Sequence, residues 1–176
     1  MTYATRVLRL CAPVAPAILL LSLGAGTVSA GPPAAATPAA NIKGKTYRME
    51  RAYYVAAHVP VDDVDRVVAA VGAAVGLEYG NYDQVAYINA EGLEQFRPLT
   101  GSKAGAAAEP GRNPTKVVSF SVPHDDRVLK KALDAIYASH SYEEPVIYVT
   151  EVLRSRETSR DEKNPNKWWN QPSQPH

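Results

Sequence analysis

Hydrophobic positions recur with two different periods along the middle of the chain. Residues 51–59 are rich in β-branched and aromatic side chains and stop at Pro60, which predicts a strand. The next valines recur at helical spacing and predict a helix with one apolar face: Val64, Val67, Val68, Val71 and Val75. We expect Asp62 to cap this helix, Gly76 to end it and Gly80 to form the following turn.

The same plan returns 63 residues later. Residues 116–122 predict a strand that again ends in Val-Pro, and Asp125 and Asp126 match Asp62 and Asp63. The buried face of a second helix is expected to comprise Leu129, Ala132, Leu133 and Ile136. Tyr142 then falls where Tyr79 falls in the first half, so each unit ends in a related motif: Gly80-Asn81-Tyr82-Asp83 and His140-Ser141-Tyr142-Glu143-Glu144-Pro145.

Each predicted helix is followed by another strand, over residues 84–90 and 146–153. The order is therefore β-α-β twice, and short βαβ crossovers are right-handed. Two such halves predict an α+β fold, the ferredoxin-like split βαβ. In this fold a four-stranded antiparallel sheet carries both helices on one face.

The predicted strands carry large apolar side chains on both faces. They include Tyr53, Tyr54, Val55, Val85, Tyr87, Ile88, Phe120, Val122, Ile147, Tyr148 and Val149. Helices cover only one face, so the other face needs a second cover, and self-association is the simplest source of one. We therefore expect a homo-oligomer with sheets packed toward each other. The alternative is a solvated face of scattered tyrosines.

A long connection, residues 91–115, joins the two halves. Connections of this length are usually functional or partly disordered. We expect the first part, with Phe96 and Leu99, to pack against the domain and residues 103–112 not to pack.

The ends of the chain differ in composition from the middle. Residues 1–30 combine early arginines, a short apolar stretch and Val28-Ser29-Ala30, which is typical of a secretory signal peptide cleaved after Ala30. Residues 31–46 form a Pro/Ala-rich linker, residues 47–156 the domain, and residues 157–176 a polar flexible tail. We therefore expect a periplasmic or secreted protein. Trp168 and Trp169 in the tail could dock on a partner or lie exposed at a disordered end.

Charge and cysteine content exclude some partners. Removal of residues 1–30 removes two arginines from 19 Lys+Arg against 18 Asp+Glu and leaves a net charge of −1. That balance gives no electrostatic case for nucleic acid or an anionic membrane. The single cysteine, Cys11, lies in the predicted signal peptide, so the mature chain would form no disulfide.

The two helix-exit motifs, together with Glu91-Gly92 and Phe96-Arg97-Pro98-Leu99-x-Gly101, give the chain a family resemblance. Over residues 51–153 it resembles the YqfO-type domain inserted in many Nif3-like dinuclear-metal proteins, which is similar in fold to PII and to the divalent-ion tolerance protein CutA. The resemblance implies a PII-like fold and a trimer, and it carries over no catalytic residue. Val85, Glu94 and Ser141 depart from the family pattern.

A few residues leave room for ligand chemistry. His140, Glu143 and Glu144 lie together, and Asp83 matches them in the first half, so a divalent-metal or small-ligand site is possible. Neighbouring glutamates on a strand point to opposite faces, so at most one joins His140. The structural alternative is that Tyr142 packs, Pro145 fixes a turn and the acids cap or pair.

Nucleophilic catalysis has no support, because Gly-x-Ser-x-Gly and His-Glu-x-x-His are absent and no catalytic residue stands out. Two hypotheses follow: an exported, non-enzymatic, trimeric binding or scaffolding module without a cofactor, or a divalent-metal-binding protein of CutA type. A hydrolase that needs a partner subunit is a third, weaker idea.

Overall fold

The computed structural model of the chain describes residues 42–159 and 163–171. The predicted signal peptide and residues 31–41 of the predicted linker lie outside the described residues, as do residues 160–162 and 172–176 of the predicted tail. Within the part of the chain that is described, no helix has the length and hydropathy of a membrane-spanning segment.

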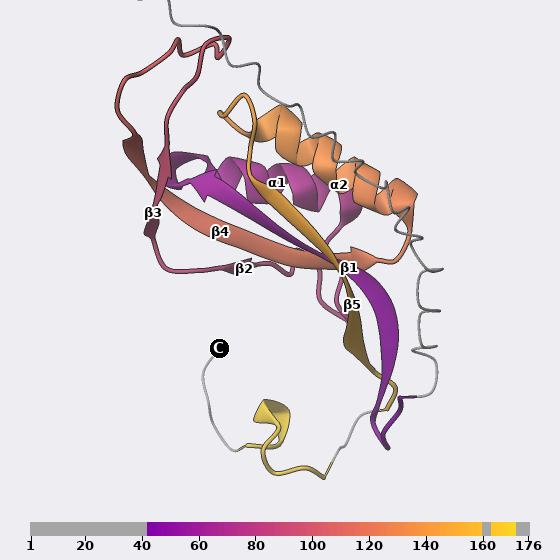
Figure 1. Cartoon of the computed structure of the whole chain (residues 1–176). Helices are drawn as coiled ribbons and strands as arrows, with labels where there is room; N and C mark the ends of the chain where they lie inside the picture. The colour runs from indigo at the N-terminus through magenta and orange to yellow at the C-terminus, as the bar shows by residue number, and fades with distance from the viewer. Residues whose placement is uncertain (1–41, 160–162, 172–176) are drawn as a thin grey trace, which may run out of the picture. The chain divides into compact units, whose positions relative to one another are not determined.

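The domain is built on an antiparallel sheet (Figure 1). Its strand order is β2-β4-β1-β5, with β3 paired to β4. The strands are β1 (Tyr47–Pro60), β2 (Tyr87–Ile88), β3 (Gly92–Phe96), β4 (Gly111–Pro123) and β5 (Ile147–Glu157). Without β3, this is the order of the predicted ferredoxin-like fold, which is thereby confirmed.

Helices α1 (Val64–Val75) and α2 (Asp126–Ser139) lie together on one face of the sheet (Figure 1). The predicted apolar faces form the core, in which Val67, Val71, Ala132 and Ile136 are buried against Val55 and Val118. Both repeats therefore contribute one amphipathic helix and one central strand to a single hydrophobic core.

The helix ends follow the predicted chemistry in most places. Asp125 caps α2, since its side chain accepts a hydrogen bond from the Arg127 N–H at 2.8 Å. Gly76 ends α1 with φ 73°, in the left-handed region that favours glycine. The predicted cap at Asp62 is wrong, because residues Val61–Asp63 form a 3-10 turn and the N-cap position falls to Asp63, whose side chain bonds elsewhere.

The connection between the halves is more regular than predicted. Gly92–Phe96 pairs with Gly111–Thr115 as a hairpin, so part of the stretch expected not to pack is strand β4. The predicted strand over residues 84–90 is reduced to two paired residues, Tyr87 and Ile88, which pair with Ser119 and Val118 of β4. Leu99 is 63% exposed, so the expectation that it packs is wrong, whereas the Phe96 ring contacts Tyr142.

Strands β1 and β5 continue beyond the rest of the sheet. Residues 47–51 pair with residues 153–157, whereas β4 pairs with β1 only from Ala52 onward. The result is a two-stranded ribbon, which projects from the sheet in Figure 1. Both strands of the ribbon continue into the sheet, which anchors it at that end.

Candidate functional site

The two helix-exit motifs lie at opposite ends of β1. Tyr79, beside the first motif, donates a hydrogen bond from its hydroxyl to the Ser155 carbonyl at 2.6 Å, and Ser155 pairs with Met49. His140, in the second motif, bonds the carbonyl of His58. Nine residues of extended strand separate Met49 from His58, which is about 30 Å. Because β1 and β4 run antiparallel, the helices that follow them end at opposite ends of the sheet.

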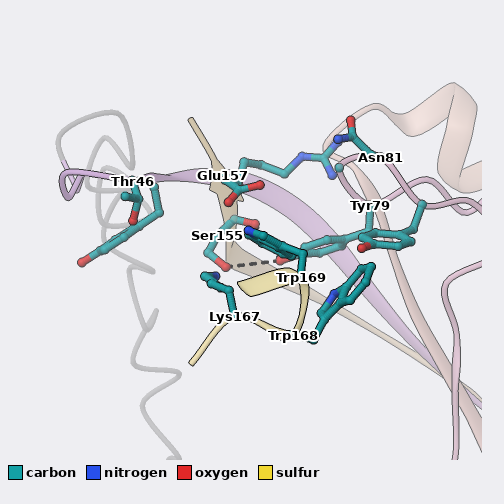
Figure 2. Close-up of a pocket in the computed structure, with 12 residues that line it drawn as sticks. Thr46, Tyr79, Asn81, Ser155, Glu157, Lys167, Trp168 and Trp169 are labelled. Atoms are coloured by element: carbon teal, nitrogen blue, oxygen red, sulfur yellow. Dashed lines mark hydrogen bonds between the residues drawn. The ribbon is translucent and has the colours of Figure 1, made fainter. Parts of the chain in front are cut away.

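The first motif forms one wall of an open cleft of about 720 Å³ (Figure 2). The turn is closed by backbone hydrogen bonds between Tyr79 and Tyr82, and Gly80 adopts φ 66° within it. The facing wall is a 3-10 turn, Trp168–Asn170, which presents two indole rings. The cleft is lined by Thr46, Tyr47, Tyr79, Gly80, Asn81, Tyr82, Ser155, Arg156, Glu157, Lys167, Trp168 and Trp169.

Cations stack on the aromatic rings of the cleft. The guanidinium carbons of Arg156 and Arg154 lie 5.2 and 5.6 Å from the centroid of the Tyr79 ring. The Lys167 ammonium lies 5.4 Å from the Trp169 ring, and the two indoles meet edge to face with centroids 5.7 Å apart. These contacts tie the first turn to the ribbon and order the aromatic rings within the tail.

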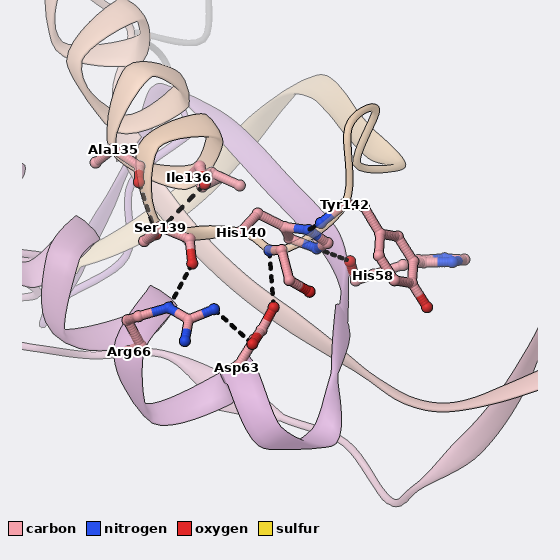
Figure 3. Close-up of polar contacts among 9 residues, drawn as sticks. His58, Asp63, Arg66, Ala135, Ile136, Ser139, His140 and Tyr142 are labelled. Carbon is pink, nitrogen blue, oxygen red and sulfur yellow. Dashed lines mark hydrogen bonds and ion pairs between the residues drawn. The ribbon is translucent and has the colours of Figure 1, made fainter. Parts of the chain in front are cut away.

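The second motif is a closed polar network instead of a cavity (Figure 3). His140 is buried, its Nε2 lies 2.8 Å from the His58 carbonyl oxygen, and its Nδ1 accepts from the Tyr142 N–H at 3.0 Å. A carbonyl can only accept, so Nε2 carries the hydrogen and donates. Both ring nitrogens are therefore committed to holding the turn after α2 against β1.

Asp63 completes this network from the start of α1. Its buried carboxylate accepts from the Ser141 N–H at 2.8 Å and from Arg66 Nη2 at 2.5 Å, while Arg66 Nε donates to the Ser139 carbonyl. Burial opposes ionisation, but the hydrogen bonds from Ser141 and the charge of Arg66 outweigh it and lower the pKa of Asp63. Asp63 therefore remains ionised and ties α1 to the end of α2.

The structure does not bring the candidate metal ligands together. Glu143 is exposed and accepts from the Lys103 N–H, Glu144 is exposed, and Asp83 follows Tyr82 at the far end of β1. Among the described residues, no three His, Cys, Asp or Glu side chains are grouped as a metal ion requires. In this arrangement His140 also offers no lone pair to a metal, since Nδ1 accepts from the backbone.

The sheet face opposite the helices carries a row of tyrosines and small residues. The pairing aligns Tyr87 with Ser119, Ser119 with Ala56 and Ala56 with Tyr148, so these side chains share one face across β2, β4, β1 and β5. Tyr87 and Tyr148 are 69% and 60% exposed, whereas Ser119 is buried. The next row aligns Tyr54 with Ser121 and Thr150, and the Ser121 hydroxyl accepts a hydrogen bond from Arg154 at 3.0 Å.

Comparison with known proteins gives a structural likeness without a family assignment. No protein-family model matches the chain, and no curated protein matches its sequence. A solved Bacillus cereus protein related to NIF3 is similar, with 25% identity and a TM-score of 0.52 over 62% of this chain. The chain spans only 28% of that protein. This likeness confirms the resemblance to Nif3-like proteins that the motifs indicated.

Looser likenesses extend to the two other groups named by the sequence motifs. The divalent ion tolerance protein CutA1 from Ehrlichia chaffeensis matches 58% of this chain, and 82% of its own length, with 13% identity and a TM-score of 0.43. GlnK from B. subtilis matches 58% of this chain, and 86% of its own length, with 11% identity and a TM-score of 0.39. Neither bears on what this chain binds.

Sequence reasoning did not find the cleft. From the sequence, Trp168 and Trp169 are candidates for docking on a partner or for an exposed, disordered end. In the structure the two indoles line one cleft with Tyr79 and Tyr82, which the sequence places at a turn. The one available signal was the concentration of Lys and Arg with Tyr and Trp in the segments on either side of the domain.

Proposed function

We propose that this chain is an exported, non-catalytic binding module that works as a homo-oligomer. The observation that carries the proposal is the uncovered sheet face, where Tyr87 and Tyr148 flank the smaller Ser119 and Ala56. A second copy of the same face would place tyrosines over the small residues and withdraw two large, mostly exposed rings from water. The trimer is the state that the family resemblance implies.

Polar contacts of the described histidines favour binding over catalysis. His58 Nδ1 lies 3.2 Å from Glu94, His124 Nε2 lies 3.2 Å from Glu151, and His140 bonds the backbone, so none of the three is aligned with a hydroxyl nucleophile. Tyr53 donates to Asp126, and this hydrogen bond raises the pKa of Tyr53 and keeps it protonated. These groups support the domain instead of forming an acid–base pair in a cavity.

Sedimentation velocity tests the assembly. We expect the chain from Gly31 onward to sediment as an oligomer at micromolar concentration, and Tyr87→Ser with Tyr148→Ser to sediment as a monomer with an unchanged circular dichroism spectrum. Tyr137→Ser is the matched control, because Tyr137 is also mostly exposed but lies on α2. A monomeric parent chain, or a double variant that assembles like its parent, would contradict the proposal.

Export is tested separately, by mass spectrometry of the chain expressed with its own N-terminus in a bacterium. The predicted cleavage after Ala30 gives a periplasmic or secreted product that begins at Gly31. A product that retains residues 1–30 in the cytoplasm would contradict export and would leave the assembly proposal standing.

A further inference from the structure

We propose that the cleft between the first turn, the β1–β5 ribbon and the tail binds a small carboxylate that carries a flat apolar ring. This inference rests on the proposed binding function and names a ligand class for it. It does not depend on assembly, because all of the lining residues belong to one copy. A volume of about 720 Å³ falls in the ordinary range of small-molecule sites, which is roughly 300–1,000 Å³.

The walls of the cleft fit a flat ring. Tyr79 and Tyr82 come from one turn, Tyr47 from the start of β1, and Trp168 and Trp169 from the tail. Tyr82 is 63% exposed and Trp168 51% exposed, so aromatic surface on both walls is accessible to solvent. Aromatic rings bind other flat apolar groups by stacking or edge contacts, with a gain of about 0.5–1.5 kcal/mol beyond the buried area.

Resident cations argue against a cationic ligand. Aromatic cages for quaternary ammonium groups need open ring faces and no competing positive charge. Here Arg156 and Arg154 already stack on Tyr79, and Lys167 stacks on Trp169. A bound cation would have to displace or approach these groups, so the cleft favours a neutral or negative ligand.

The charged side chains of the cleft favour a ligand with a single negative charge. Arg156 Nε is paired with Glu50 at 3.0 Å, and Glu157 lies on the cleft wall. Among the described residues, Lys167 has no carboxylate partner within salt-bridge distance, so its ammonium can pair with a ligand. One available cation beside a wall carboxylate matches a monoanion better than a dianion.

The distribution of charge over the described residues also favours an anionic ligand at this end of the domain. Described residues 42–51 and 151–171 hold eight Lys and Arg against three Glu, whereas residues 52–150 hold eight Lys and Arg against thirteen Asp and Glu. The near-neutral total therefore conceals a basic ribbon and an acidic body. A basic end of this kind attracts anions from solution toward the cleft.

The chain carries its own reporters of this site, because its only two tryptophans both line the cleft. Indole N–H signals in a ¹H–¹⁵N spectrum can be followed while phenylacetate, phenylacetamide or acetate is added. We expect phenylacetate to shift at least one indole signal saturably, its neutral amide to bind about fivefold more weakly and acetate to cause no saturable shift.

Matched variants locate the binding. Lys167→Gln should weaken phenylacetate binding about fivefold, and Tyr82→Ala about tenfold through lost ring contact. The controls are Lys131→Gln and Tyr137→Ala, which make the same changes on α2, outside the cleft lining. Equal binding of acid and amide, equal effects of site and control variants, or no saturable shift would overturn the proposal.

Titration of the Tyr87→Ser, Tyr148→Ser double variant separates this proposal from the one on assembly. Binding that persists in a monomeric double variant supports a site built within one copy. Binding lost there while the spectrum and fold are unchanged would overturn that placement. If the chain is oligomeric and phenylacetate does not shift its indole signals, the proposed cleft ligand is refuted and the assembly proposal still stands.

Discussion

At the scale of single residues, Asp63 holds the two halves of the repeat together. Its carboxylate accepts hydrogen bonds from the turn after α2 and from Arg66 on α1, and it is buried. Its counterpart, Asp126, instead accepts from the Tyr53 hydroxyl. The repeated aspartates therefore have different partners, because only one of them faces the end of the other helix.

We expect Asp63→Asn to lower the free energy of unfolding by about 1.5–3 kcal/mol at neutral pH, since a charged acceptor of two hydrogen bonds is lost. Urea denaturation followed by circular dichroism measures this. Asp134→Asn is the control: its exposed carboxylate pairs only with Lys130 on the same helix, and such pairs contribute about 0.5 kcal/mol or less.

The same comparison has a predicted pH dependence. The native pKa of Asp63 lies below its unfolded value, which is about 3.9. The ionised carboxylate therefore stabilises the fold fully above that value, and the stabilisation is lost as the pH falls from about 4 through the native pKa. The stability difference between the parent chain and Asp63→Asn should be constant from neutral to mildly acidic pH and then shrink. A difference that grows below pH 4 would contradict this assignment.

A metal titration tests the other residue-scale expectation. Zinc or copper binding at His140 would require the loss of its contact with Tyr142 or His58. We therefore expect the heat of zinc or copper titration, measured by calorimetry, to be the same for the parent chain and for Glu143→Gln. Heat that does depend on Glu143 would support the divalent-metal hypothesis and show that the turn after α2 can rearrange.

At the scale of elements, the glycine inside α1 and the glycine that caps it have opposite roles. Gly76 ends the helix with φ 73°, whereas Gly72 lies inside it. An added Cβ would meet Gln84 at 3.6 Å from Gly72 and Glu78 at 3.6 Å from Gly76, so neither position is blocked by contact. Backbone conformation alone then decides the effect of a side chain.

The same Gly→Ala change should therefore have opposite signs at the two positions. Gly72→Ala should stabilise the domain by about 0.5–1 kcal/mol, and Gly76→Ala should destabilise it by about 1–2 kcal/mol because of the left-handed backbone. Thermal unfolding of both variants in parallel measures the difference. Equal destabilisation would mean that crowding at Gln84, rather than helix propensity, governs position 72.

Periodicity was informative for elements that bury one face. Both helices and the central strands lie where the valine and leucine spacing placed them, because burial in a core requires that spacing. The sequence pattern does not predict the hairpin of β3 with the start of β4, because most of its residues, such as Leu93, are exposed. Backbone hydrogen bonds hold this hairpin together, and they produce no hydrophobic pattern in the sequence. The strand expected over residues 84–90 was overestimated for a related reason: alternation favours an extended chain but does not supply a partner.

At the scale of the whole molecule, the domain is polarised. A basic, aromatic ribbon lies at one end of β1 and a closed polar network at the other, while a tyrosine-bearing face lies opposite the helices. These three surfaces do not overlap in their residues. Separate variants can therefore test the proposed assembly and the proposed ligand binding.

Assembly through the uncovered face predicts a concentration-dependent melting temperature. Association that favours the folded state raises the apparent stability by mass action, so the Tm of the parent chain should rise with protein concentration. The Tm of the Tyr87→Ser, Tyr148→Ser variant should not change over the same range. Scanning calorimetry at several concentrations checks this, and a Tm independent of concentration in the parent chain would contradict assembly.

The sequence by itself determined the repeat, the helix faces, most of the helix ends and the class of fold. These features depend on local backbone preference and on which side chains leave water. Both can be read from the order of residues in the sequence. Tertiary structure alone decided the roles of the two matched motifs. Antiparallel pairing of β1 with β4 carries them to opposite ends of the sheet, so Tyr82 borders an open cleft while His140 is locked into a polar network. Tyr79 and Trp169 lie 90 residues apart in the sequence but line the same cleft beside the ribbon. The periodicity of hydrophobic residues in the sequence does not predict this proximity.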